Sequence, residues 1–330
     1  QQAACRENDQ EILYAALQTG KHLGLIEEFA GDEVVLESNR VLIPIQFIAD
    51  LTLSGSRSAR LAGLSLFVVS NSPTKPIQPA VFEQLKHALP HLHADTDAFS
   101  RSELFSLTQR LFDRIRCATA VLARTTSTGT LESMEQHKSF ISWYTQFITW
   151  ELRPTSSYQR HISALKCLSI LLRSGVDGSI SKVHLSKLAS GASAWPFEMS
   201  IVDPGMHRLL LDLLMNSFEE VRQTSASILE LCTSASGLNA NSSKNVLNVA
   251  KERAIARMLA SGRADHADGV AYIHGLSYVL AATPEDQKLV LTALLDKTED
   301  MLSVADRDLA RAVDKFPLHG LLTSLRYVLL

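Results

Sequence analysis

The sequence predicts an all-α protein, built as an α-solenoid of paired antiparallel helices. Apolar residues recur with the 3.6-residue period of a helix along most of the chain, and short polar breaks separate the periodic segments. Hydrophobic residues make up 46% of the 330 residues and charged residues only 20%, which supplies a large core and excludes global disorder. Helix pairs repeated over this length favour a solenoid over a single bundle.

The first half of the chain predicts helices separated by clear breaks. A polar segment at 54–58 and a loop at 72–76 interrupt the pattern, because prolines and small polar residues cannot continue a helix. Pro79 suits the first turn of a helix. The expected helices are 11–25, 59–69, 79–92, 97–124, 131–152 and 156–173, with a further apolar stretch at 41–53. No strand is expected, since the apolar run at 34–36 is too short.

The second half continues in the same way. Helices are expected at 182–188, 206–217, 221–232, 243–259, 265–280 and from 318 onward, and 284–315 is expected as one helix or as two that break near Ser303. A Thr-rich segment predicts a linker-like loop over 125–134, between a first part of the array at 1–124 and its continuation at 135–330. Because the chain starts without Met and ends on Tyr-Val-Leu-Leu, we expect a fragment of a longer protein.

Three segments share a pattern that is typical of the second helix of a HEAT or armadillo repeat. Each has an arginine after a polar break, and a small or aliphatic residue four positions later lets two helices approach. The pairs are Arg60 with Leu64, Arg160 with Ala164, and Arg222 with Ala226. The pattern predicts a HEAT/armadillo-like array with each arginine at the exposed start of its helix. The alternative is three ordinary amphipathic helices with a chance arginine.

Motifs of nucleotide-dependent and hydrolytic enzymes are absent from the sequence. It contains neither GxGxxG nor GxxxxGK[ST], and neither HExxH nor GxSxG. We therefore expect no enzyme activity and no cofactor. The cysteines are too widely spaced for a zinc site or a disulfide framework, and we expect reduced thiols at Cys5, Cys117, Cys167 and Cys232.

Membrane and secretion signals are also missing from the sequence. No apolar run approaches the roughly 20 residues that span a bilayer. The polar, partly acidic start does not resemble a signal peptide, which has a basic start and an apolar middle. We therefore expect a cytoplasmic protein that does not bind membranes.

A histidine-rich segment is a candidate metal site. Its metal-capable residues are His87, His91, His93, Asp95 and Asp97. Pro90 is expected to bend or end the helix there and to leave His93 in a loop. Surface histidines near the negative end of a helix dipole explain the same residues, so we predict no metal. The glycosylation sequon at Asn241 is better explained as a helix cap in a chain without a secretory signal.

Basic residues cluster on two of the predicted helices. The net charge of −3 gives no general support for nucleic-acid binding, so any RNA contact depends on a local stripe. If both helices turn their cations to one surface, a phosphate-binding stripe results. The alternative is a solvated helix face. The candidate RNA-binding residues are Arg101, Arg110, Arg114, Arg116, Arg160, Lys166 and Arg173, with Arg124 and Arg153 close by.

Aromatic residues are densest near the end of the helix expected at 131–152. Trp143, Phe147 and Trp150 share one face of that helix. Burial in the core is the predicted role of such residues. An exposed patch for a partner is the alternative.

Three parts of the chain resemble one known family. They are the helix at 58–66, the segment 140–165 with its Tyr-Gln-Arg motif, and Pro-Leu-His-Gly-Leu-Leu at 317–322. In this order and spacing they resemble the THADA family of large armadillo/HEAT proteins. The resemblance implies a non-catalytic scaffold for 2′-O-ribose methylation of the tRNA anticodon loop. Such a scaffold binds a FtsJ-type tRNA 2′-O-methyltransferase, which supplies the S-adenosylmethionine pocket, and helps to position the tRNA.

Two functions therefore remain open at the level of the sequence. The first is an RNA-modification adaptor, and the second is a protein-only α-solenoid scaffold with no RNA contact. Exposure of Arg110, Arg114 and Arg160 on one face favours the first function. Pairing of these arginines with neighbouring carboxylates favours the second.

Overall fold

The computed structural model describes residues 2–124, 128–187, 189, 195–214, 216, 218–233, 284–307, 322 and 325. The chain divides into two compact units, residues 1–151 with 155–201 and residues 152–154 with 202–330. Helices α1 to α7 and a small sheet belong to the first unit, and α9, α10 and α13 belong to the second.

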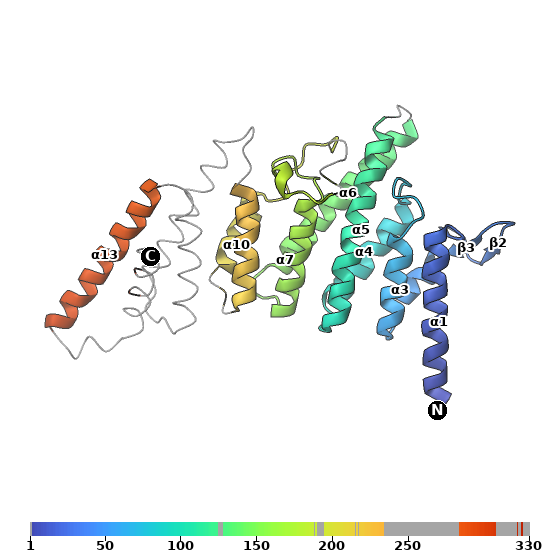
Figure 1. Cartoon of the computed structure of the whole chain (residues 1–330), viewed down its shortest axis with the longest axis horizontal. Helices are drawn as coiled ribbons and strands as arrows, with labels where there is room; N and C mark the ends of the chain where they lie inside the picture. Colours follow the sequence, from blue (N-terminus) through green and yellow to red (C-terminus); the bar gives the residue numbers. More distant parts are fainter. Residues whose placement is uncertain are drawn as a thin grey trace. The chain divides into compact units, whose positions relative to one another are not determined.

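The helices of the first unit form two layers (Figure 1). Helices α1, α3, α5 and α7 pack side by side as the odd layer, and α2, α4 and α6 form the even layer behind them. Their bounds are α1 Gln2–Leu23, α2 Ile45–Thr52, α3 Arg57–Val68, α4 Pro79–His93, α5 Ala98–Leu122, α6 Thr128–Glu151 and α7 Tyr158–Arg173. This arrangement confirms the predicted array of helix pairs.

Side-chain contacts fix the direction of the helices within each layer. On α5, Phe105 meets Lys166 and Arg116 meets the carbonyl of Ser174, so α5 and α7 run parallel. On α4, Phe82 stacks on Phe140 and His93 contacts Phe147, with ring centroids 4.6 Å and 4.8 Å apart, so α4 and α6 also run parallel. Helices within a layer are therefore parallel, and consecutive helices from opposite layers are antiparallel, as a helical solenoid requires.

Local sequence signals set the helix ends. Side-chain oxygens of Ser56, Asp97 and Ser157 accept hydrogen bonds from the backbone N–H three residues later, which satisfies a donor that the first turn leaves free. Pro79 occupies the start of α4, where its missing N–H costs nothing. Gly24, with φ of 77°, follows the last residue of α1 in the left-handed conformation that ends many helices.

A small sheet corrects the expectation that the chain has no strands. Strand β1 (Ile26–Phe29) pairs in parallel with β3 (Val41–Pro44), and β2 (Val35–Leu36) pairs antiparallel with β3. Its strands are only two to four residues long, so the sequence pattern could not separate them from loop. The apolar stretch at 41–53 is accordingly β3 followed by α2.

Several predicted helix boundaries also differ from the structure. Helix α4 continues through Pro90 to His93, because a proline in the last turn removes only one hydrogen bond of the helix. Within the helix predicted at 182–188, the described residues form a short 3₁₀ turn at Lys182–His184, and a helical position follows only at 187. Helix α6 begins at Thr128, so the predicted loop at 125–134 is helical from that residue on. The assignment of repeats to 1–124 and 135–330 stays a prediction.

The second unit contains α9 (Pro204–Leu213), α10 (Glu219–Thr233) and α13 (Pro284–Arg307). Helices α9 and α10 pack against each other as a consecutive pair. Helix α13 is continuous through Ser303, so no break occurs there. The helices expected at 243–259, at 265–280 and from 318 onward, and the helix cap expected at Ser242 or Ser243, lie outside the described residues, apart from single helical positions at 322 and 325.

The repeat arginines tie their helices to the chain before them. Arg60 donates to the carbonyl oxygens of Ser54 and Gly55 at 3.0 and 3.1 Å, and Arg222 donates to that of Asn216 at 2.7 Å. Arg60 also binds the carboxylate of Asp95 at 2.9 Å, and Arg160 binds that of Glu151 at 2.9 Å. The shared role explains the sequence pattern, but the predicted exposure is wrong for Arg222, which is buried.

Candidate nucleic-acid interface

Arg114 is buried, which corrects its assignment to an RNA-binding stripe. Its side chain is 3% exposed, and it donates to the carbonyl oxygens of Phe67, Val68 and Lys75 at 3.1, 3.1 and 3.2 Å. Its Nη2 lies 3.9 Å from a carboxylate oxygen of Glu28. Because its donors serve the C-terminal end of α3 and a buried carboxylate, Arg114 is a structural residue.

Arg116 is buried in the same manner on the other side of α5. The residue is 4% exposed and donates to the carbonyl oxygens of Ser174, Gly175 and Ala189. Two of these carbonyls follow the last turn of α7, where carbonyl groups lack partners within the helix. Burial lowers the pKa of the Arg116 guanidinium, and the nearby charges of Cys117 and Asp113 oppose this shift. The assignment of Arg116 to an RNA-binding stripe is therefore also wrong.

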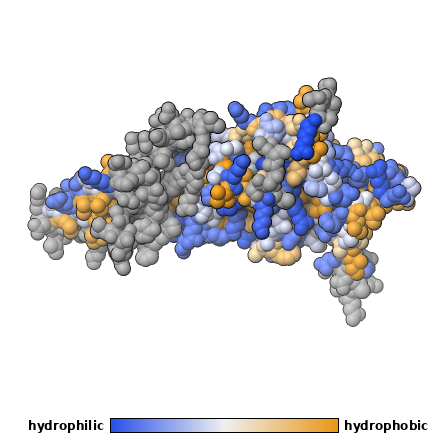
Figure 2. Space-filling view, turned by 45° about the horizontal axis from the view of Figure 1, so that its top comes forward, coloured by the Kyte–Doolittle hydropathy of each residue, from blue (hydrophilic) through white to orange (hydrophobic). Residues whose placement is uncertain are grey.

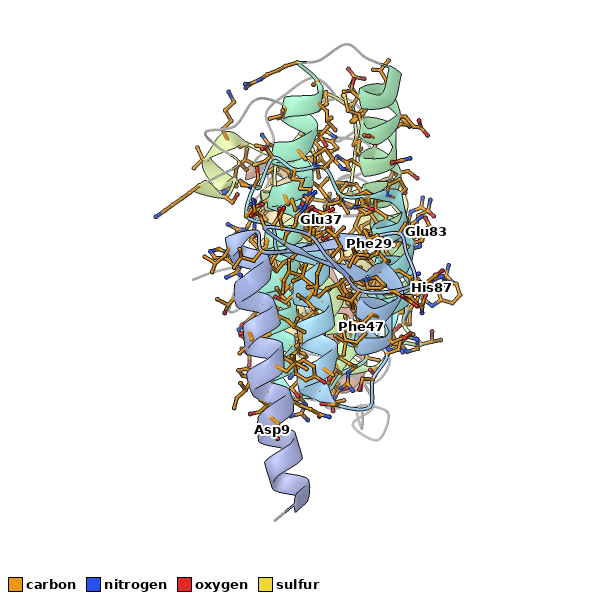
Figure 3. The ribbon with its side chains drawn as sticks, turned by 90° about the vertical axis from the view of Figure 1, so that its right-hand side faces the viewer. Asp9, Phe29, Glu37, Phe47, Glu83 and His87 are labelled. Carbon is orange, nitrogen blue, oxygen red and sulfur yellow. The ribbon has the colours of Figure 1, made fainter. Side chains whose placement is uncertain are left out.

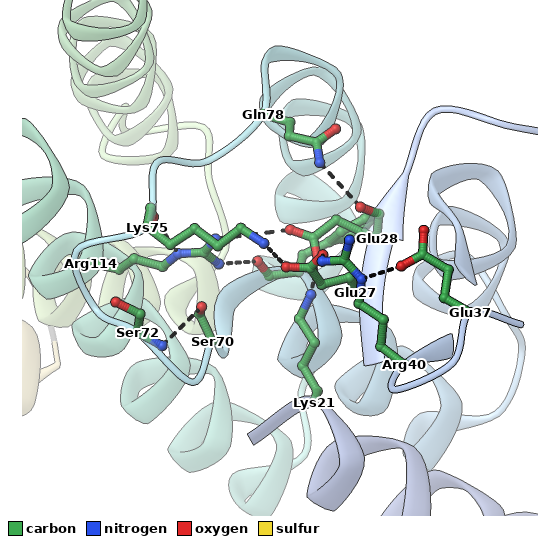
Figure 4. A network of polar contacts seen from close by, with 11 residues as sticks. Lys21, Glu27, Glu28, Glu37, Arg40, Ser70, Ser72, Lys75, Gln78 and Arg114 are labelled. Atoms are coloured by element: carbon green, nitrogen blue, oxygen red, sulfur yellow. Dashed lines mark hydrogen bonds and ion pairs between the residues drawn. The ribbon is translucent and has the colours of Figure 1, made fainter. Parts of the chain in front are cut away.

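Glu28 is the centre of a buried ionic network around Arg114 (Figure 4). Its carboxylate pairs with Lys21 of α1, and both side chains are almost fully buried. Burial, with the nearby charges of Arg114 and Lys75, lowers the pKa of Lys21 to about 7. On the adjacent residue, Glu27 binds Lys75 and, at 2.6 Å, Arg40. These pairs hold α1, β1 and α5 together, so they belong to the fold.

Three predicted cations remain on one outer surface, which we call the basic face: Arg110, Lys166 and Arg173. Arg110 is exposed on α5, and Lys166 and Arg173 lie seven residues apart on the exposed side of α7. The Lys166 ammonium lies 5.8 Å from the ring centroid of Phe105, which places it between the two parallel helices. Arg101 is half-buried in the first turn of α5, and Arg160 is committed to Glu151.

Two further cations near this surface were not among the RNA-binding residues predicted from the sequence. Lys182 and Lys187 are exposed in the segment that follows α7. A simple signal could have found them, because residues 152–197 contain six lysines and arginines but one carboxylate, Asp177. That carboxylate is buried, so it does not neutralise the surface. The whole chain, in contrast, has slightly more acidic than basic residues.

The histidine segment does not form a metal site. Among the residues that the structure describes, no group of three or more His, Cys, Asp or Glu side chains could hold a metal ion. His93 is fully buried at the end of α4, not in a loop, and its Nε2 lies 3.3 Å from the Tyr144 hydroxyl and 3.8 Å from the Cys167 sulfur. Burial and the charge of Arg160 lower the pKa of His93 to about 3. His87 points to the outside of α4 (Figure 3).

The aromatic residues of α6 are divided between core and surface. Tyr144 is fully buried, whereas Trp143 and Phe147 are half-buried and stack with ring centroids 5.6 Å apart. Trp150 is 58% exposed on the same side of the helix. The prediction of core packing is therefore wrong for Trp150. Trp143, Phe147 and Trp150 form what we call the aromatic face, on the outer side of the even layer.

Other exposed apolar side chains are distributed over the described surface. Figure 2 shows hydrophobic patches that hydrophilic side chains interrupt. Among the exposed residues are Leu36 of β2, Phe47 of α2 and Leu289 of α13. No helix in the described part of the chain is long and apolar enough to cross a membrane.

Comparison with known proteins identifies the family. A family model described as Trm732, TPR repeats, matches residues 1–223, which is about two thirds of the chain. The chain belongs to this family. The description of the Trm732 family mentions TPR repeats, which are helical pairs like the HEAT and armadillo repeats expected from the sequence. The predicted resemblance to THADA proteins is confirmed by the relatives below.

Two curated relatives match most of the chain. The Schizosaccharomyces pombe protein named tRNA (32-2′-O)-methyltransferase regulator trm732 is 22% identical over 310 residues, which cover 91% of this chain and 20% of that protein. The Mus musculus protein named tRNA (32-2′-O)-methyltransferase regulator THADA is 21% identical over 300 residues, covering 79% of this chain and 15% of that protein. This member of the Trm732 family thus spans about a fifth or less of the relatives it matches.

Solved structures add little to this comparison. A designed armadillo repeat protein matches 86% of the chain, with 11% identity and a TM-score of 0.30. An engineered protein matches the same share, with 12% identity and the same TM-score. The description of this Trm732-family chain as an array of helix pairs depends on its own contacts.

Proposed function

We propose that this protein is a non-catalytic regulator subunit of a tRNA 2′-O-methyltransferase of the FtsJ type. It binds the methyltransferase in the cytoplasm and helps to position the anticodon loop of tRNA, while the partner carries the S-adenosylmethionine and the reaction. The names of the two relatives support this function, since both are regulators of a methyltransferase acting at tRNA position 32.

The basic face is the observation that carries the RNA part of this proposal. Helix α7 has no carboxylate and carries the half-buried Lys166 and the exposed Arg173, while the neighbouring helix α5 carries the exposed Arg110. Seven residues correspond to about 10 Å along a helix axis, so the cations form a track that suits an extended polyanion. Cations of this kind contact phosphates and set the orientation of the nucleic acid without reading its sequence.

The salt dependence of tRNA binding tests the basic face. Lys166→Gln/Arg173→Gln in the full-length protein is expected to reduce the slope of log affinity against log salt by about 1.4–1.8, because each lost phosphate contact flattens it by roughly 0.7–0.9. The matched control is Lys86→Gln/Lys138→Gln, which removes two charges from the even layer. Each pair contains one lysine whose ammonium lies over an aromatic ring: Lys166 over Phe105, and Lys138 over Phe197. An equal effect of the two pairs would rule out the basic face as the RNA contact.

The aromatic face favours protein binding as the second function. A half-exposed tryptophan is the side chain most enriched at the energetic centre of protein interfaces. If the protein is a protein-only scaffold, the aromatic face should bind its partner and the basic face should be an ordinary solvated surface. Both functions therefore predict that the aromatic face binds a protein. Only the adaptor function predicts that the basic face binds RNA.

Replacement of Trp150 tests the aromatic face. Trp150→Ala is expected to weaken binding of the methyltransferase by about tenfold or more, the effect of losing a central aromatic contact. Phe99→Ala is the control, because Phe99 is an aromatic residue of the odd layer with a similar exposed fraction, 66% against 58% for Trp150. The measurement is the dissociation constant of the two-protein complex. Unchanged affinity for Trp150→Ala would show that the methyltransferase docks elsewhere.

A further inference from the structure

The segment that follows α7 is held in place by buried polar groups. The backbone N–H of Ser186 donates to the carbonyl of Arg173 at 2.9 Å, which folds the segment back onto the end of α7. Arg116 binds the carbonyls of Ser174 and Ala189, at the two ends of this fold-back. Figure 1 shows the segment as a short yellow-green excursion beyond α7.

Asp177 provides a second anchor for the same segment. The carboxylate is 2% exposed, and it accepts hydrogen bonds from the backbone N–H and the hydroxyl of Ser179 at 2.9 and 2.6 Å. Its other oxygen accepts from the N–H of Ile201 at 2.8 Å, 24 residues away in the chain. A buried carboxylate that accepts three hydrogen bonds stabilises a loop of defined shape.

Gly175 shows how closely Arg116 is built into this segment. Its φ of 78° lies in the left-handed region, and a Cβ at this position would lie 2.3 Å from a guanidinium nitrogen of Arg116. The backbone conformation favours glycine, and a side chain at this position would displace the Arg116 guanidinium. The turn and the arginine therefore fit each other, and the direction of the chain after α7 is fixed.

The outer part of this segment, residues 178–187, contains lysines and no Asp or Glu in its sequence. Lys182 and Lys187 are exposed, and Val183 between them is 88% exposed. No Asp or Glu occurs from Gly178 to Phe197. Because the backbone of Ser186 is bonded to that of Arg173, the adjacent residue Lys187 lies near the C-terminal end of α7, where Arg173 is exposed.

We propose that residues 178–187 form a preorganised RNA-phosphate-binding loop, in which Lys182 and Lys187 contact the sugar-phosphate backbone. This inference deepens the proposed function and rests on it. A loop fixed by Arg116 and Asp177 loses little entropy when it binds, so two lysines there contribute more than two lysines on a flexible chain. Lysine acts on phosphate as a point charge, so the contact adds affinity and orientation without sequence preference. Arg116 and Asp177 are positioning residues for this loop.

The test is tRNA binding by the full-length protein in complex with its methyltransferase, across a salt series. Lys182→Gln/Lys187→Gln is expected to weaken binding about tenfold at moderate salt and to reduce the log–log slope by about 1.4–1.8. Binding of the methyltransferase is expected to stay unchanged. Since both lysines are exposed, the double variant should fold normally, and Lys86→Gln/Lys138→Gln serves again as the matched control.

Limited trypsin digestion gives a second readout at the loop itself. Cleavage after Lys182 and Lys187 in the wild-type complex is expected to slow when tRNA is added. Absence of both the affinity loss and the protection, while Lys166→Gln/Arg173→Gln still weakens binding, would overturn the loop and leave the proposed function intact. Absence of tRNA binding by the wild-type complex would instead contradict the proposed function. Loss of an acidic protein partner in the loop variant, with tRNA binding unchanged, would assign the loop to protein binding and overturn the RNA contact.

Discussion

Arg114→Met is expected to lower the free energy of unfolding by about 3–5 kcal/mol, the cost of removing one partner from a buried ionic cluster. The change leaves the carbonyls of Phe67, Val68 and Lys75 without their donor and removes one of the two cations next to the Glu28 carboxylate. Burial lowers the pKa of Arg114 to about 10, so the guanidinium is charged at neutral pH. Methionine fills a similar volume, which limits the contribution of a cavity.

Arg110→Met on the same helix is the matched control. Arg110 is exposed, and an exposed substitution of this kind changes stability by about 0.5 kcal/mol or less. Urea denaturation followed by circular dichroism would compare the two variants, with the same slope m required for a valid comparison. Equal and small effects of both variants would contradict the structural role assigned to Arg114.

Acidification between pH 6.5 and 4.5 is expected to destabilise the protein by roughly 5 kcal/mol through two buried histidines. Burial is the main cause that lowers the pKa of His93 to about 3 and that of His137 to about 4, while unfolded histidines titrate near 6.5. Above pH 6.5 both states are neutral. Below pH 6.5, the two histidines of the unfolded chain take up protons. In the folded protein the same histidines stay neutral until the pH approaches their lower pKa values. Each histidine therefore costs about 1.4 kcal/mol per pH unit in this window.

A variant of one histidine isolates this effect. His93→Phe places a ring among Tyr144 and Phe147 and removes one titrating group, so the dependence of stability on pH should become shallower by about 1.4 kcal/mol per unit. His87→Phe, at an exposed position of the same helix, should leave the dependence unchanged. Denaturation curves at pH 6.5, 5.5 and 4.5 make the comparison. Parallel pH profiles for the wild type and His93→Phe would show that His93 does not account for the loss.

The long helices and their starts could be predicted from the sequence, because they depend on local signals. Ser56, Asp97 and Ser157 cap helices that the apolar period also indicates, so two independent patterns agree. The sheet could not be predicted, because β2 has two residues and its pairing with β3 is a contact between separate segments. Periodicity in a window of ten or more residues does not detect such strands.

Candidate site residues were harder to predict than helices, because the sequence does not show which face of a helix is buried. Arg110, Arg114 and Arg116 lie within seven residues of α5, yet Arg110 is exposed and the other two are buried on carbonyl groups. These carbonyls belong to α3 and to the segment after α7, which are distant in the sequence. Lys182 and Lys187 could not be placed near Arg173 from the sequence, because the fold-back that bonds Ser186 to Arg173 joins residues 13 positions apart and leaves no periodic signal.

Helix α5 is bonded to both of its neighbours in the odd layer, α3 and α7, through two arginines that are two positions apart in the sequence. Arg114 holds the end of α3, and Arg116 holds the end of α7. In a linear array, stability is a sum of the intrinsic terms of the repeats and the couplings between nearest neighbours. Strong couplings on both sides of one helix make independent fraying of α3 or α7 unfavourable. The stretch from α3 to α7 should therefore unfold as one cooperative unit, so that amide hydrogens at its two ends exchange with solvent with a similar free energy of opening.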